Sequence, residues 1–141
     1  MFPITHCRHF QPLQSSAFTG SDATVAVPSR LYFKETPDKP LNGRRIAIKD
    51  NIDLSGVVTG MGNKAYAELY RERTESAKFI QLLLGKGAIV VGKTKLSALA
   101  GSEVPPCQCI DYFPPWNARG DGYQGPSGSS SGAGSAAGGY D

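Results

Sequence analysis

Residues 74–91 constrain the fold more than any other stretch of this chain, because a helical pattern there is followed at once by a short apolar run. Thr74 is a candidate N-cap, and Gly85 is placed to end the helix. The apolar stripe between them consists of Ala77, Ile80, Leu83 and Leu84. The run Ala88–Val91 has no polar position, as is typical of a strand covered on both faces. A helix close to such a strand predicts an α/β layered fold.

A second strand is predicted upstream, over Arg45–Lys49. Ile46 and Ile48 would face one side of it, and the residues between them would face the other. Lys49 would therefore stand at the carboxyl end of this strand, beside the turn-forming pair Asp50–Asn51.

The remaining segments carry weaker patterns. Residues 1–42 hold scattered prolines and predict an irregular N-terminal arm with one short strand at Ser29–Phe33, ahead of a domain over residues 43–141. Lys95–Ala100 predicts the start of another helix. Residues 120–139 are mostly Gly, Ser and Ala, so they have little to bury, and we expect no helix or strand to close the chain there.

Composition excludes several classes of protein. The chain has 141 residues, a formal net charge of +3, 40% hydrophobic and 19% charged residues, which fits neither a disordered tail nor a basic nucleic-acid arm. It holds no apolar run of about 18 residues that could span a bilayer, and its first residues lack a secretory pattern. Its 3 cysteines cannot form a closed disulfide framework. We expect a cytoplasmic protein with no membrane or nucleic-acid partner.

Two further features have ordinary explanations. The potential metal ligands have poor spacing for a zinc site, so we expect loop residues and no bound metal; they are His6, Cys7, His9, Cys107 and Cys109. Trp116 is expected to pack under the Gly/Ser-rich segment rather than to stack on a base.

The Gly/Ser-rich segment over residues 125–137 has two interpretations. Such runs are commonly flexible linkers. Alternatively, glycines let backbone N–H groups converge on an anion, while serines supply hydroxyls for proton transfer or attack. Composition alone leaves both open.

Four blocks, taken together, resemble the amidase signature family of Ser-cisSer-Lys amide hydrolases. They are Ile46–Ile52, Val91–Thr94, Pro115–Asn117 and the Gly/Ser-rich segment, and their order and separation over residues 41–141 are similar to the family's. Lysine replaces the asparagine that the family usually shows after Lys-Thr, at Lys95.

The resemblance implies a catalytic pair. Lys49 falls on the family's base, and Ser129 falls on the serine that follows a cis peptide bond and passes a proton to the lysine. A triple serine makes Ser130 and Ser131 reserve candidates. By position, residues that would line the acyl pocket are Ala100, Gly101 and Gly128. No cofactor or metal is needed.

The resemblance also implies a partial core, with a mixed sheet flanked by helices and truncated before completion. The family's attacking serine would lie about two dozen residues after Ser129, beyond Asp141, so we expect this chain alone not to hydrolyse amides. The complete enzyme would act on a small-molecule amide by acyl transfer to water. An exposed sheet edge would favour self-association.

Two alternatives remain. The chain could be a non-catalytic binding or regulatory module on an amidase-like scaffold. Gly87–Thr94 also fits the phosphate-binding pattern Gly-x4-Gly-Lys-Thr, although Ala-Ile-Val-Val between the glycines favours an extended strand over a phosphate cradle.

Overall fold

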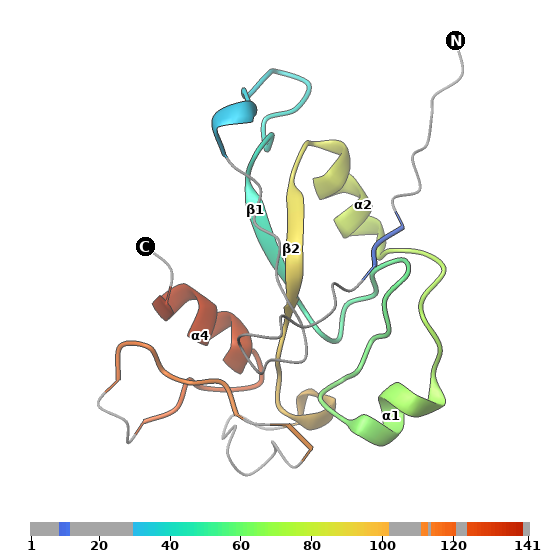
Figure 1. Cartoon of the computed structure of the whole chain (residues 1–141), viewed down its shortest axis with the longest axis vertical. Helices are drawn as coiled ribbons and strands as arrows, with labels where there is room; N and C mark the ends of the chain where they lie inside the picture. The colour runs from blue at the N-terminus through green and yellow to red at the C-terminus, as the bar shows by residue number, and fades with distance from the viewer. Residues whose placement is uncertain (1–8, 12–29, 102–110, 113, 121–123, 140–141) are drawn as a thin grey trace, which may run out of the picture.

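The computed structural model describes residues 9–11, 30–101, 111–112, 114–120 and 124–139. Along these residues it forms a 3-10 turn η1, strand β1, helices α1 and α2, strand β2, a second 3-10 turn η2 and helix α4 (Figure 1). Their bounds are Arg30–Tyr32, Arg45–Lys49, Lys64–Leu69, Lys78–Gly85, Ile89–Thr94, Ala98–Ala100 and Ser131–Gly139.

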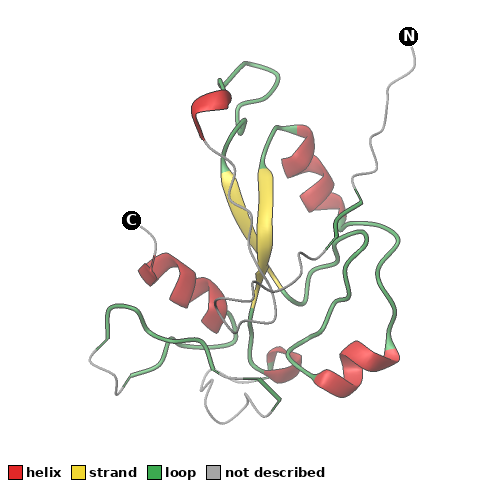
Figure 2. Ribbon diagram, in the orientation of Figure 1, coloured by secondary structure: helices red, strands yellow, loops and turns green. Residues whose placement is uncertain are grey.

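The two strands lie parallel and form the centre of the described part of the molecule. Helix α2 packs on one side, where its buried residues share a core cluster with Ile48, and α4 contacts both strands from the other side (Figure 2). The predicted α/β arrangement is confirmed. Within the described residues the sheet has only this parallel pair, so the mixed sheet that we expected is not seen there.

The core forms between the sheet and α2. Ile48 is 3% exposed and lies in one buried cluster with Leu54, Ile80 and Leu84. Ala77 and Leu83 pack against this cluster, so the predicted apolar stripe of the helix is confirmed. Along β1, Ile48 is buried and Ala47 is exposed, as the pattern predicted, but Ile46 is only partly buried, like Arg45 and Lys49 at the strand ends.

Helix α2 begins later than predicted, because residues 74–77 are engaged in tertiary hydrogen bonds. The Thr74 carbonyl accepts the Ser55 hydroxyl at 2.9 Å, and the Ala77 N–H donates to the Asp53 carbonyl at 3.0 Å. The N-cap is therefore Ala77 instead of Thr74. The helix ends at Gly85 as expected.

Strand β2 extends beyond the predicted run Ala88–Val91. Gly92, Lys93 and Thr94 join it because they pair with the last three residues of β1. Ala88 is fully buried, but all residues of β2 keep partial exposure, so the strand is not covered on both faces by the described residues.

Two predicted elements are wrong. Instead of a strand at Ser29–Phe33, the described residues of that segment begin with the turn η1. Leu31 is 91% exposed there, so the alternating hydrophobic pattern of this segment does not correspond to a buried face. Ser29 lies outside the described residues. Instead of a helix at Lys95–Ala100 there is only η2, because the Leu99 N–H donates to the distant Met61 carbonyl at 2.8 Å and Leu99 adopts φ +53°.

The glycine- and serine-rich segment ends in helix α4, although its composition predicted no helix. The Gly132 N–H donates to the Lys95 carbonyl at 2.9 Å. A Cβ at Gly132 would lie 2.6 Å from the same oxygen, so the close approach needs glycine. Tertiary packing against the sheet thus overrides a poor helix propensity.

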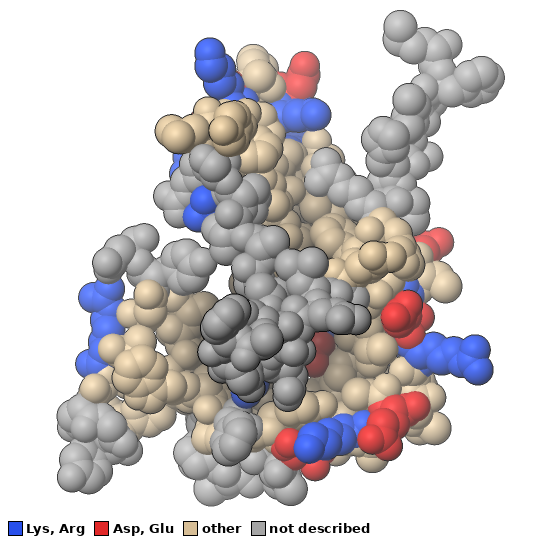
Figure 3. Space-filling model, viewed as in Figure 1, with Lys and Arg blue, Asp and Glu red and all other residues tan. Residues whose placement is uncertain are grey.

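Charged side chains of both signs are interspersed on the face shown in Figure 3, rather than gathered into one basic patch. This agrees with the modest net charge of +3. Among the described residues, no helix has the length and apolar character needed to cross a membrane.

Candidate active site

The Lys49 amine meets two serine hydroxyls at the carboxyl end of β1. Its Nζ donates to Ser129 Oγ at 2.6 Å and to Ser130 Oγ at 2.9 Å. Ser129 is half-buried and Ser130 is exposed. The fold therefore brings together the lysine and the serine that the sequence analysis paired across 80 positions.

The peptide bond between Gly128 and Ser129 is cis, and it is the only cis bond of the described residues. The predicted register, with Ser129 after the cis bond, matches this geometry. Ser130, a reserve candidate, shares the lysine. Ser131, the other reserve candidate, does not reach it: its side chain is fully buried at the start of α4, and its hydroxyl has no hydrogen-bond partner among the described residues.

The segment after β2 holds the serine loop in place. The Ser97 N–H donates to the Ser129 carbonyl at 3.3 Å, and the Lys95 carbonyl accepts the Gly132 N–H at 2.9 Å. Because β2 runs beside β1, a loop tied to the continuation of β2 is carried to the end of β1, where Lys49 stands.

The residues predicted to line an acyl pocket lie on the segment that follows β2 and on the serine loop that precedes α4. Ala100 and Gly101 belong to the turn that follows Ser97, and the Ala100 N–H donates to the Ser97 carbonyl at 2.9 Å. Gly128 directly precedes Ser129. Their contact with a substrate stays a prediction.

A second lysine lies close to the first. Lys93 Nζ pairs with Asp50 Oδ1 at 2.6 Å, and their side chains are 12% and 24% exposed. No sequence pattern assigns a role to Asp50, although its position directly after Lys49 is a signal for one. The alternative of a phosphate-binding loop at Gly87–Thr94 fails on this geometry, because residues Ile89–Thr94 form a strand and the Lys93 amine is held by a carboxylate.

Tyr112 lies near α1. The Asp111 carboxylate accepts the Lys64 N–H at 2.7 Å at the start of the helix, and the Lys64 amine lies 5.7 Å from the centre of the Tyr112 ring. Burial, followed by the negative charges of Asp50, Asp111 and Glu68, raises the pKa of Tyr112. A neutral phenol is therefore retained to higher pH than in free tyrosine.

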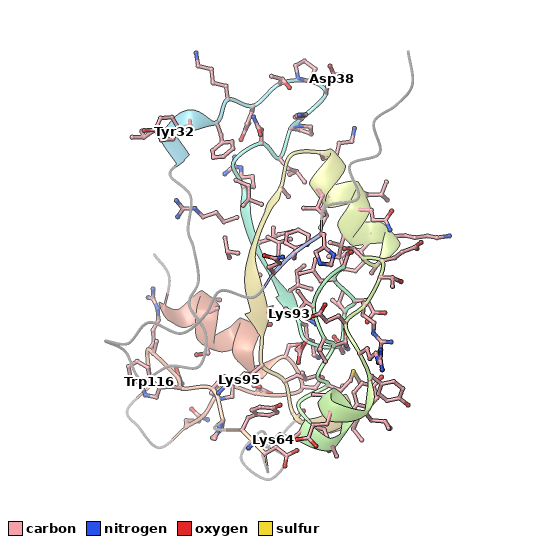
Figure 4. All side chains as sticks on the ribbon, turned by 45° about the vertical axis from the view of Figure 1, so that its right-hand side comes forward. Tyr32, Asp38, Lys64, Lys93, Lys95 and Trp116 are labelled. Atoms are coloured by element: carbon pink, nitrogen blue, oxygen red, sulfur yellow. The ribbon has the colours of Figure 1, made fainter. Side chains whose placement is uncertain are left out.

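Trp116 differs from its prediction. It is 70% exposed, so it is not a buried anchor, and Figure 4 shows it below α4 in that view. It borders a hollow of about 180 Å³ lined by Pro114, Pro115, Trp116, Asn117, Gln124 and Gly125. The backbone does help to hold α4, since the Trp116 carbonyl accepts the Ser135 hydroxyl at 2.5 Å.

The candidate metal ligands cannot be assembled from the described part of the chain. His6, Cys7, Cys107 and Cys109 lie outside it, which leaves His9. In the ranges that the structure covers, no three His, Cys, Asp or Glu residues gather as a metal site would require.

Residues 15–139 match the profile of the family described as Amidase. This chain belongs to the amidase family. Among curated relatives, it is 38% identical over 90 residues to mandelamide hydrolase of Pseudomonas putida, covering 60% of this chain and 17% of that protein. It is 34% identical over 99 residues to one subunit of the glutamyl-tRNA(Gln) amidotransferase of Halobacterium salinarum, covering 70% of this chain and 22% of that subunit.

Solved amidase-family structures share the fold of the described core. Allophanate hydrolase of Kluyveromyces lactis superposes with a TM-score of 0.59 at 31% identity, covering 73% of this chain and 16% of that one. The corresponding amidotransferase subunit from Thermotoga maritima gives a TM-score of 0.58 at 26% identity, covering 76% and 22%. This chain thus spans less than a quarter of the length of these relatives.

Proposed function

We propose that this chain carries the base and the proton-relay serine of an amide hydrolase, with Lys49 as the base and Ser129 as the relay. The observation that supports the proposal is the 2.6 Å hydrogen bond between Lys49 Nζ and Ser129 Oγ. The relatives named mandelamide hydrolase and allophanate hydrolase support amide hydrolysis as the reaction class.

In the proposed reaction, a nucleophilic serine supplied by sequence beyond residue 141 attacks the amide carbonyl. Its proton passes to Ser129 Oγ while the Ser129 proton passes to Lys49 Nζ, so that no charge accumulates on the relay. The protonated lysine then returns a proton by the same path to the departing amine. Water hydrolyses the resulting serine ester and releases the acid.

In this proposal, residues 43–141 form the first part of an amidase domain and residues 1–42 form an N-terminal arm. Ala100, Gly101 and Gly128 would border the acyl group, where small side chains leave room for it. The substrate is a small-molecule amide, and no cofactor enters the reaction. This part of the domain alone would be inactive, and its open sheet edge would favour self-association.

A chimera tests the proposal directly. Residues 41–139 of this chain would replace the matching segment of the Pseudomonas putida mandelamide hydrolase, which supplies the rest of the domain. We expect the chimera to hydrolyse mandelamide and Lys49→Ala to reduce kcat by about 100-fold or more, the scale of a lost general base.

Lys86→Ala is the matched control, since Lys86 is an exposed lysine next to α2. It should leave the rate unchanged. If a folded, active chimera kept its rate after Lys49→Ala, the assignment of Lys49 as base would be wrong. A folded chimera without any activity would favour the non-catalytic module instead.

A further inference from the structure

Lys93 completes the Gly-x4-Gly-Lys-Thr pattern, and the proposed function gives it no task. We infer that Lys93 is a positioning residue: its ion pair with Asp50 fixes the end of β1 so that Lys49 is directed to Ser129 on the opposite side of the sheet. The inference rests on the proposed function, because it concerns how the base reaches its relay partner.

Alternation along β1 separates the two lysines. Ile48 points into the core, so Lys49 must point to the other side, where it meets Ser129. The Asp50 N–H donates to the Thr94 carbonyl at 3.0 Å, which attaches the residue after β1 to the end of β2. Its carboxylate reaches Lys93, the partner of Ile48 in the ladder, so the Asp50 side chain lies on the side of Ile48 and opposite to the Lys49 site.

A β-bulge brings Lys93 to that same side. Ile46 pairs with Val90, but Ala47 pairs with Gly92, so Val91 is an extra residue in β2. Without it, simple alternation from Val90 would turn Lys93 away from the core side. With it, Lys93 pairs with Ile48 and shares its side of the sheet. Figure 4 shows Lys93 on the side of the loop that follows β1, away from α4.

Both members of the ion pair make further polar contacts. Besides Asp50 Oδ1, the Lys93 amine approaches the Val58 carbonyl at 3.3 Å and the Thr59 hydroxyl at 3.4 Å. The other oxygen of Asp50 accepts the Gly60 N–H at 3.1 Å. An ion pair with few exposed atoms holds a fixed geometry when its remaining hydrogen-bonding groups are satisfied in this way. Asp50, and with it the backbone of Lys49, is thereby held in one place.

Nuclear Overhauser spectroscopy of the full 141-residue chain tests the inference without requiring activity. With lysine and serine labelled, the cross-peak between Lys49 Hε and Ser129 Hβ reports their contact. We expect Lys93→Met to lower its intensity by at least half, while the methyl resonances of Ile80 and Leu84 keep their positions. Lys93→Arg should restore the cross-peak, because it keeps the positive charge.

Arg44→Met is the matched control, because it removes an exposed ion pair of the same 2.6 Å length, Arg44–Glu35; it should leave the cross-peak intact. If Lys93→Met leaves Asp50 unpaired and prevents folding, the double variant Asp50→Asn with Lys93→Met removes the pair without an unpaired charge. An undiminished cross-peak in either folded variant would overturn the inference, and so would failure of both to fold, since the pair would then serve stability alone. An inactive chimera would contradict the proposed function and leave this result unaffected.

Discussion

The Lys49 amine donates a 2.6 Å hydrogen bond to the Ser129 hydroxyl, joining the end of β1 to the loop that precedes α4. The contact depends on two neighbouring relationships. The parallel pairing of β1 and β2 places Lys49 beside the end of β2. The backbone hydrogen bonds made by the Ser97 and Gly132 N–H groups attach the serine loop to the segment that follows β2.

The two serines that share Lys49 should differ in their effect on catalysis. Ser129 is half-buried and makes the shorter bond, whereas Ser130 is exposed and lies at 2.9 Å. In the active mandelamide hydrolase chimera we expect Ser129→Ala to lower kcat by about 100- to 10,000-fold, the range of a lost proton-transfer group. Ser130→Ala should lower it by less than about tenfold. Steady-state kinetics measures both, and a reversed order would move the relay to Ser130.

The contribution of α2 to stability should follow the burial of its leucines. Leu84 is 9% exposed in the core cluster, whereas Leu82 on the same helix is 70% exposed. Leu84→Ala should reduce the free energy of unfolding by about 2–5 kcal/mol. The same substitution at Leu82 should change it by less than about 0.5 kcal/mol. Urea denaturation of the two variants makes the comparison, and equal losses would contradict the core described above.

Local patterns predicted the elements whose hydrophobic period coincides with a buried face. The stripe through Ile80 and Leu84 is of this kind, and so is the inward position of Ile48 in β1. The pairing of Lys49 with Ser129 came from a family resemblance, since no local rule links residues so far apart.

The missed features depend on tertiary contacts. Thr74 is a good N-cap residue, but its carbonyl is engaged by Ser55. Helix α4 contains residues of low helix propensity that the sheet supports. The role of Asp50 depends on the bulge at Val91, which shifts register within one strand and has no signature in the sequence.

Tyr112 gives a prediction for alkaline pH. Its pKa is raised, so the folded chain holds the phenolic proton more tightly than the unfolded chain does. Its contribution to stability is therefore complete below the ordinary tyrosine pKa of about 10 and is lost as pH rises through the folded value. The difference in near-ultraviolet absorbance between the unsubstituted chain and Tyr112→Phe should titrate above about pH 10.

Tyr32→Phe is the control for this titration, because it removes a tyrosine that is 86% exposed. It should leave the signal of Tyr112 unchanged. A difference titration for Tyr112 at or below about pH 10 would show that burial and the neighbouring carboxylates do not act on the phenol as described.

Two glycines of α4 should respond in opposite directions to the same substitution. A Cβ at Gly132 would lie 2.6 Å from the Lys95 carbonyl oxygen, so Gly132→Ala must push the helix away from the segment after β2. We expect a loss of about 1–3 kcal/mol in the free energy of unfolding, the usual cost of overpacking. A Cβ at Gly134 would meet only Pro126, at an ordinary 3.4 Å. Gly134→Ala should therefore stabilise the chain by about 0.5–1 kcal/mol through helix propensity.

The same pair of variants distinguishes the effect of packing α4 against the segment after β2 from the effect of helix propensity within α4. Gly132→Ala should weaken the contact between Lys49 and Ser129, because the Gly132 N–H bond to Lys95 holds the serine loop beside β2. Gly134→Ala should leave that contact unchanged. Denaturation curves give the stabilities, and the Lys49–Ser129 cross-peak gives the contact. Stabilisation by both alanines would mean that α4 does not pack against Lys95 as closely as the structure has it.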